Sequence, residues 1–433
     1  MKSIETTLSE QPLTEPEIVG MCSQRLARIK PAMMKFVEQN QAQGFITAIT
    51  RQGKLVHHET MGYMDIESQK PMQADAIFRL HSQTKPVIAV AIMQLYEQGC
   101  FTLSDSIADY LHEFSDMEVL KADGTRVAAT PMTIKHLLTH TAGLSYYLHA
   151  EEPVGKMYLK AGLVTNLARL NGTTSEQYVK KIAALPLIAQ PGTVWKYSEA
   201  MGVLGRLVEV ISGLTLGEYL LKNIFQPLRM VDTGFYVKPE SIHRLVSQYF
   251  PKEGGGLIEV LPEDLENKVV SPAHDYSRQP SYESGSSGLA GTMDDYLRFA
   301  QMLANSGELE GVRLLSPTSV DAIMVNQLGP EFGDRPLAEM GAFAPSNPGI
   351  GFGFCGLVVT DIHAAGWTGS NGEYSWGGSA STDFWIDRQQ QLVALVMSQL
   401  VPTGCIPSRE RMHQMTYQAI IEKFVEIGVK NDV

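Results

Sequence analysis

Apolar and polar positions predict β-strands near both ends of the chain. Residues 45–50 and 54–59 are rich in β-branched and aromatic side chains, and the turn between them contains Gly53, which suits the positive φ of a tight turn. Residues 381–386 and 392–397 repeat this arrangement near the other end. The pattern therefore predicts two β-hairpins that are separated by most of the chain.

Helical periodicity flanks these hairpins on their outer sides. It covers residues 17–41, where Pro31 is the expected place for a kink or a break, and residues 409–427. Strands from the two ends can bury their apolar faces by forming one antiparallel sheet, with the helices packed on that sheet. We therefore expect an α+β fold.

The middle of the chain indicates a second, mainly helical domain. Residues 252–284, with three consecutive glycines and several prolines, are expected to form a surface loop region. We expect a discontinuous α/β domain from residues 1–100 and 327–433, a mainly α-helical domain over residues 101–326, and an active site between them. Helical spacing of apolar residues is found over residues 134–138, 174–185, 202–211, 216–221 and 293–304.

The strongest chemical signal is Ser82-Gln83-Thr84-Lys85, which directly precedes the apolar run 86–93. This run predicts a buried helix that ends near Gly99. Residues three apart share a helix face, so the Lys85 amine can reach the Ser82 hydroxyl and act as its base. A chance Ser-x-x-Lys pair is the alternative, although the chain has no second one.

A second candidate is Tyr197, at the start of another helical run. Its phenol can relay a proton between the nucleophile and the leaving group if a nearby ammonium lowers its pKa. The alternative is a tyrosine that only packs and donates a hydrogen bond.

A glycine pair precedes the C-terminal hairpin. Gly377 and Gly378 are typical of a strand that another backbone approaches closely. The N–H groups of such an edge can lie along a substrate, and one of them can complete an oxyanion hole. A bulge or a turn explains paired glycines equally well.

Composition narrows the function classes. The chain has 433 residues, 44% hydrophobic and 19% charged, with a net charge of −12, which disfavours nucleic acids and anionic membranes as partners. The first 15 residues are polar, and no secretory signal or transmembrane segment is expected, so a cytoplasmic location is the expectation. The four cysteines lack the close spacing of a zinc ribbon or a disulfide scaffold. No phosphate loop is found either, and no cofactor is implied.

Three motifs in this order, Ser82-x-x-Lys85, Tyr197 and Trp376-Gly377-Gly378, resemble the serine β-lactamase and penicillin-binding protein superfamily. The chain is most similar to the class C-like family VIII carboxylesterases. The resemblance covers about residues 20 to 425 and includes the segments 81–86, 137–144, 191–198 and 287–292.

The resemblance implies a β-lactamase/transpeptidase-like fold and an acyl-enzyme mechanism. Ser82 would attack a carbonyl carbon, Lys85 and Tyr197 would manage its proton, and water would release the acyl group. The backbone N–H groups of Ser82 and Ser379 would form the oxyanion hole.

Departures from the superfamily pattern favour simple esters as substrates. Penicillin-recognising enzymes usually have Lys-Thr-Gly where this chain has Trp376-Gly377-Gly378, so a cation for a substrate carboxylate is missing. Glu199 stands where class C enzymes have asparagine. Residues 146–173 and 328–351 are expected to line the cleft. The expected substrate contacts are Tyr146, Glu199, Trp376, Gly377 and Gly378.

Other functions stay open at this stage. The same fold includes β-lactamases, D-amino-acid peptidases and acyltransferases, and a protein that binds without turnover is a further alternative. No Gly-x-Ser-x-Gly elbow of an α/β-hydrolase occurs. His136 and His140 have helical spacing but lack the glutamate of a His-Glu-x-x-His metal motif. We expect a serine enzyme that cleaves small carboxylic esters.

Overall fold

The computed structural model describes residues 12–165, 169, 171–260, 275–338, 340 and 346–423. An eight-stranded antiparallel sheet dominates it, with neighbouring strands in the order β12-β13-β14-β15-β16-β1-β2-β3. The strands are β1 (Gly44–Arg51), β2 (Lys54–Asp65), β3 (Lys70–Pro71), β12 (Ile350–Phe352), β13 (Leu357–Val359), β14 (Tyr374–Gly378), β15 (Thr382–Asp387) and β16 (Leu392–Met397).

The two predicted hairpins form the centre of this sheet. The strand β1 pairs with β2, β15 pairs with β16, and β1 also pairs with β16. The two ends of the chain therefore meet at the β1–β16 pair, which confirms the predicted antiparallel sheet. The turn residue Gly53 has φ +70°, as the hairpin pattern requires.

Alternate residues of β1 enter two different cores. Ile46 and Ala48 pack in the larger core, whereas Phe45 and Ile49 pack in a smaller one. A central strand that is covered on both faces has apolar residues at successive positions, which explains why β1 is buried along its whole length.

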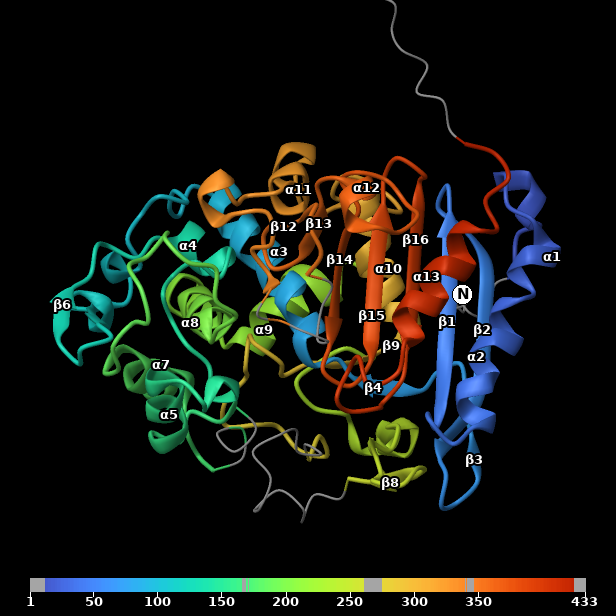
Figure 1. The fold of residues 1–433 in the computed structure, drawn as a ribbon, viewed down its shortest axis with the longest axis horizontal. Coiled ribbons are helices and arrows are strands. Elements are labelled where there is room, and N and C mark those ends of the chain that lie inside the picture. Colours follow the sequence, from blue (N-terminus) through green and yellow to red (C-terminus); the bar gives the residue numbers. More distant parts are fainter. Residues whose placement is uncertain are drawn as a thin grey trace, which may run out of the picture.

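Helices cover both faces of the sheet (Figure 1). The helix α10 (Met293–Ala304) packs on β15 and β16, while α2 (Ile29–Glu38) and α13 (Ser408–Tyr417) pack together on the opposite face. The smaller core holds residues of α2 and α13 together with β1, β15 and β16.

Most of the remaining helices form a helical region beside the sheet (Figure 1). Between this region and the sheet lies α3 (Thr84–Glu97), which packs against α8 (Ala200–Ser212). This region also contains α4 (Ile134–Leu138), α5 (Pro153–Lys160), α7 (Ser175–Ala183) and α9 (Leu216–Leu220). Elsewhere α11 (Pro317–Met324) packs on α3, α1 (Ser23–Leu26) packs on α13, and α12 (Ile362–Ala365) lies between β13 and β14 in sequence.

Four two-stranded sheets complete the described elements. One of them, β4 (Ile77–Arg79) with β9 (Ala290–Thr292), holds together two segments that are distant in sequence. The others are β5 (Glu118–Leu120) with β6 (Arg126–Ala128), β7 (Tyr249–Pro251) with β8 (Leu257–Glu259), and β10 (Glu308–Leu309) with β11 (Val312–Arg313).

The helices predicted at the two ends are shorter than expected. Residues 17–41 contain a 3-10 turn, α1 and α2, and the break before α2 precedes Pro31, which lies in the first turn of that helix. At the other end α13 stops at Tyr417, because Ile420 then pairs with Met21 as an isolated β-bridge. Residues 424–427 of the predicted helix lie outside the described residues.

Two features of the middle segment differ from the sequence expectation. The predicted loop 252–284 includes part of the β7–β8 hairpin, and its residues 261–274 lie outside the described part. Although α10 falls within residues 101–326, it packs on the sheet. The domain boundaries stay a prediction.

The helices among the described residues are short. No single helix there is long and apolar enough to cross a membrane. The helical segments Ala200–Ser212 and Leu216–Phe225 together have the length and the apolar composition of a membrane span, but the chain bends by 77° between them.

Candidate active site

Ser82 lies in a 3-10 turn, His81–Gln83, that leads directly into α3. The pairing of β4 with β9 anchors this turn, and the Leu80 N–H donates to the Leu289 carbonyl over 2.9 Å. His81 has φ +46°, a left-handed conformation that is uncommon outside glycine. Backbone strain thus sits at the residue before the candidate nucleophile.

Lys85 is fully buried one turn after Ser82. Its Nζ lies 3.0 Å from Ser82 Oγ and donates to the Ser286 carbonyl over 2.7 Å. Burial lowers the pKa of Lys85 to about 7, against the opposing charge of Glu199. Near neutral pH a large fraction is therefore a neutral amine, which can accept the Ser82 proton.

Tyr197 approaches the same oxygen from another segment. Its hydroxyl donates to Ser82 Oγ over 2.7 Å, and Lys85 Nζ lies 4.6 Å from the centre of its ring. Burial raises the pKa of Tyr197, although its hydrogen bond to Ser82 acts in the opposite direction. The condition stated for a proton relay, a pKa lowered by a nearby ammonium, is not met here, because burial of the phenol raises its pKa. Tyr197 remains a phenol and can act as a proton donor.

Hydrogen bonds on both sides fix the segment that carries Tyr197. His149 Nε2 donates to the Tyr197 carbonyl over 2.9 Å, and Lys196 pairs with Glu152 at 2.7 Å. Neither His149 nor Glu152 was singled out in the sequence, although both lie in the segment 146–173 expected to line the cleft. Their roles depend on a contact between segments about 45 residues apart, which no local pattern reveals.

The two histidines with helical spacing have separate structural roles. His136 Nδ1 accepts the Thr133 N–H over 3.2 Å in a capping box at the start of α4. His140 Nδ1 accepts the Ser198 N–H over 3.3 Å, and its ring lies 4.8 Å from that of Tyr197. His136 caps a helix, whereas His140 holds the Ser198 backbone and packs on Tyr197. The two rings do not share a metal site.

The glycine strand β14 lies against the Ser82 turn. A Cβ added at Gly378 would lie 2.3 Å from the Leu80 carbonyl oxygen, and one at Gly377 would lie 2.1 Å from Asp383 Oδ1. Both distances are too short for any side chain. The predicted close approach of another backbone is therefore confirmed at Gly378, where that backbone leads to Ser82, whereas the nearest atom at Gly377 belongs to the Asp383 side chain.

Ser379 follows this strand in the turn between β14 and β15. Among the described residues, the structure records no acceptor for the backbone N–H of Ser82 or of Ser379. Since β14 lies against the Ser82 turn and Ser379 directly follows β14, these two N–H groups stay the predicted oxyanion donors.

Substitution of Gly378 by alanine is expected to impair both folding and activity. The new methyl group would displace the Leu80 carbonyl and with it the Ser82 turn, at a cost of about 2 kcal/mol in unfolding free energy. Denaturant unfolding and ester hydrolysis measure the two effects. Gly234→Ala is the matched control, because the nearest atom to its Cβ is 3.6 Å away. Normal stability of Gly378→Ala would contradict the steric argument.

Comparison with known proteins agrees with this arrangement. Residues 29–411 match the beta-lactamase family. The chain belongs to this family. It is 33% identical over 367 residues to protein Rv1367c of Mycobacterium tuberculosis, which covers 83% of this chain and 86% of that protein. It is 31% identical over 383 residues to esterase EstB of Burkholderia gladioli, with 87% and 91% covered.

A solved structure supports the same assignment. EstCE1, described as a hydrolase with promiscuous acyltransferase activity, superposes with a TM-score of 0.75 at 26% identity, covering 91% of this chain and 99% of that one. The predicted β-lactamase/transpeptidase-like fold and the resemblance to β-lactamase-fold esterases are confirmed.

In this beta-lactamase family member, aromatic side chains lie around Tyr197, whose hydroxyl contacts Ser82. The Trp376 ring is 5.8 Å from the Tyr197 ring and 5.4 Å from the Phe352 ring, and Tyr146 lies 6.0 Å from Tyr197 on another side. Trp376 and Tyr146 are both at most 5% exposed. The structure therefore places both predicted substrate contacts beside Tyr197, in apolar surroundings.

Glu199 occupies a different position from the one expected of a substrate contact. Its carboxylate is fully buried and accepts hydrogen bonds from Thr165 Oγ1 at 2.7 Å, Tyr178 OH at 3.1 Å and Ser286 Oγ at 2.9 Å. These donors surround both carboxylate oxygens. The structure thus groups Glu199 with buried hydroxyls and Lys85, and the proposed contact with substrate has no support in this geometry.

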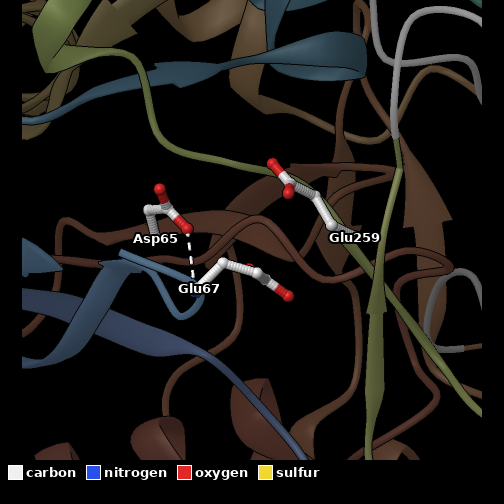
Figure 2. A group of neighbouring side chains, drawn as sticks. All are labelled: Asp65, Glu67 and Glu259. Atoms are coloured by element: carbon white, nitrogen blue, oxygen red, sulfur yellow. Dashed lines mark hydrogen bonds between the residues drawn. The ribbon is translucent and has the colours of Figure 1, made fainter. Parts of the chain in front are cut away.

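One acidic cluster is found outside this site. The carboxylates of Asp65, Glu67 and Glu259 offer oxygens within 4.8 Å of one another. Figure 2 shows the three neighbouring side chains. Tyr249 OH donates to Glu67, and the Glu67 N–H donates to Asp65. Burial and the neighbouring carboxylates raise the pKa of Glu259. Exposed acidic groups are common in proteins without a bound ion, so we do not assign a metal site to this cluster.

Proposed function

We propose that this protein is a serine esterase that cleaves small carboxylic esters through an acyl-enzyme on Ser82. One observation carries the proposal: Ser82 Oγ lies within hydrogen-bond distance of both the buried Lys85 amine and the Tyr197 hydroxyl. An activated nucleophile requires a base within this reach. The similarity to esterase EstB over most of both chains supports an ester as the substrate.

The geometry supports an acylation step in which every transferred proton has a donor and an acceptor within the site. Ser82 Oγ bonds to the ester carbonyl carbon while its proton passes to the neutral Lys85 amine. When the carbon–oxygen bond to the alcohol breaks, Tyr197 gives its proton to the leaving alkoxide and regains one from the Lys85 ammonium. Water then attacks the acyl-enzyme and releases the acid. The N–H groups of Ser82 and Ser379 stabilise the oxyanion in both steps.

A neutral substrate fits the surroundings of Ser82. Trp376 occupies the strand position where related penicillin-recognising enzymes carry a lysine, and its indole packs against Phe352 and Tyr197. An apolar wall favours the uncharged acyl or alcohol part of a simple ester, whereas a carboxylate there would lack a cationic partner.

Replacement of Trp376 by lysine is expected to shift the preference towards substrates that carry a carboxylate. We expect the ratio of kcat/KM for nitrocefin to that for p-nitrophenyl butyrate to rise about tenfold, because a charge-assisted hydrogen bond contributes roughly 1.5–3 kcal/mol. Trp376→Met is the control, since it also removes the indole but adds no charge. An unchanged ratio would exclude Trp376 from substrate selection.

Acyl transfer to an alcohol is the second candidate activity. It is suggested by the similarity to EstCE1, a hydrolase with promiscuous acyltransferase activity. Both activities share the acyl-enzyme and differ only in the acceptor that removes the acyl group.

One experiment tests both activities. The protein is incubated with p-nitrophenyl butyrate, nitrophenol release is followed, and intact-protein mass spectrometry detects the acyl adduct, which is then mapped to a residue. An adduct on Ser82 with release of butyric acid supports the esterase. Added 1-butanol that yields butyl butyrate as the main product supports the transferase instead. Absence of release and adduct would reject both.

A further inference from the structure

A buried carboxylate lies behind the proposed base. Glu199 directly precedes α8, so the positive end of that helix favours its ionised form. Three hydroxyl groups, those of Thr165, Tyr178 and Ser286, donate to its two oxygens. Burial raises the pKa of Glu199, whereas these hydroxyls and Lys85 lower it. A carboxylate this well solvated by protein groups has the means to stay charged away from water.

Ser286 connects this carboxylate to Lys85. Its carbonyl accepts a hydrogen bond from Lys85 Nζ at 2.7 Å, and its hydroxyl donates to Glu199 Oε2 at 2.9 Å. The segment that holds Ser286 is fixed to the start of α3, because the Leu289 N–H donates to Thr84 Oγ1 and β9 pairs with β4. A single residue thus contacts both groups with its backbone and its side chain.

The groups that face Lys85 leave Glu199 as its counter-charge. His81 and His140 are buried beside Lys85, and both have lowered pKa values, to about 3 for His81, so their rings are neutral. Burial raises the pKa of the Cys355 thiol, which is therefore neutral as well. Tyr197 is a phenol. Of these neighbours and Glu199, only Glu199 can balance a positive charge on Lys85.

Apart from Lys85, the titratable groups whose pKa values respond to Glu199 are mainly phenols. Its negative charge contributes to the raised pKa of six buried tyrosines, and the same charge stabilises the ammonium form of Lys85. The six are Tyr146, Tyr147, Tyr158, Tyr178, Tyr197 and Tyr282.

We propose that Glu199 is a positioning residue for acylation: through Ser286 it holds Lys85 beneath Ser82, and its charge sets the fraction of Lys85 that is free to accept a proton. This inference rests on the proposed esterase function. Without the carboxylate, the Lys85 ammonium would lose its counter-charge and release its proton at lower pH.

The test is Glu199→Gln, which keeps the side-chain shape and an oxygen that can accept from Ser286. We expect the acid limb of kcat/KM for p-nitrophenyl butyrate to move about one unit to lower pH, the size of effect that one nearby opposite charge has on a pKa. A loss of rate with an unmoved limb would mean that Glu199 only supports the fold, and would overturn the proposal.

Glu283→Gln is the matched control. Glu283 is a partly buried carboxylate on the same segment as Ser286, but it accepts the Gly217 N–H over 2.7 Å. Its replacement is expected to leave the acid limb where it is. An equal shift in both variants would show a general charge effect and overturn the assignment to Glu199.

A second readout does not require ester turnover. Lysine labelled with 13C at Cε reports the Lys85 protonation midpoint by NMR, with Lys85→Met as the assignment standard. A midpoint lowered by Glu199→Gln in a protein that hydrolyses no ester would reject the proposed function and retain the coupling. An unmoved midpoint in an active enzyme would reject the coupling alone.

Tyr178→Phe tests the same coupling if Glu199→Gln does not fold. It removes one hydroxyl from the carboxylate without changing the ring that stacks on Tyr282 at 4.4 Å. A less stabilised carboxylate is less ionised, so the Lys85 midpoint should fall in the same direction by a smaller amount. A midpoint that stays the same or rises would overturn the proposal.

Discussion

Replacement of Ser82 by alanine is expected to lower kcat/KM for p-nitrophenyl butyrate by roughly 10⁴-fold or more, as removal of the nucleophile does in other serine hydrolases. Its Oγ is the atom on which both the Lys85 amine and the Tyr197 hydroxyl converge. Nitrophenol release at saturating and limiting substrate measures the loss.

Thermal stability of Ser82→Ala should stay close to that of the native protein. The change removes one partner of two hydrogen bonds, and each contributes only about 1 kcal/mol net. Lys85 keeps its bond to the Ser286 carbonyl. Ser115→Ala, which changes an exposed serine, is the control for the effect of an ordinary Ser→Ala substitution on activity and stability. Activity retained in Ser82→Ala, or an adduct on another residue, would identify a different nucleophile.

The central sheet was predictable because its signals are local. The β-branched and aromatic runs of the strands and the turn at Gly53 follow from a few neighbouring residues, and both hairpins occur close to where the sequence predicts them. Helix limits at the chain ends depend instead on long-range contacts. The β-bridge between Met21 and Ile420 follows the end of α13 at Tyr417. Beside this bridge, Arg51 donates to the carbonyls of Gly20 and Glu422. No local pattern contains these pairings.

The same division applies to the site. Ser82 and Lys85 lie one helical turn apart, so their contact follows from spacing alone. Ser286 was not predicted, because it reaches Lys85 only through the pairing of β4 with β9. The protonation of Tyr197 and the location of Glu199 both depend on burial by distant segments, which the sequence does not specify. Residue identity was therefore more predictable than electrostatic environment.

Replacement of Lys85 by methionine is expected to lower kcat/KM for the same ester by roughly 10³-fold, within the range that a positioned general base contributes. Methionine fills the space of the lysine stem in this buried position but cannot accept the Ser82 proton. The native rate should fall as pH drops through about 7, because burial places the pKa of Lys85 there and the ammonium form has no lone pair for a proton.

The pH profile of Lys85→Met decides between a base and a structural role. If Lys85 is the base, the residual activity should lose the acid limb near pH 7, since no other group assigned to proton transfer titrates there: Tyr197 has a raised pKa. If Lys85 only supports the Ser82 turn, a slower enzyme with an unchanged limb is expected, and circular dichroism would show whether the turn was lost with the fold. Retention of the limb would transfer the role of base to another group, with Glu199 as the first candidate because Ser286 links it to Lys85.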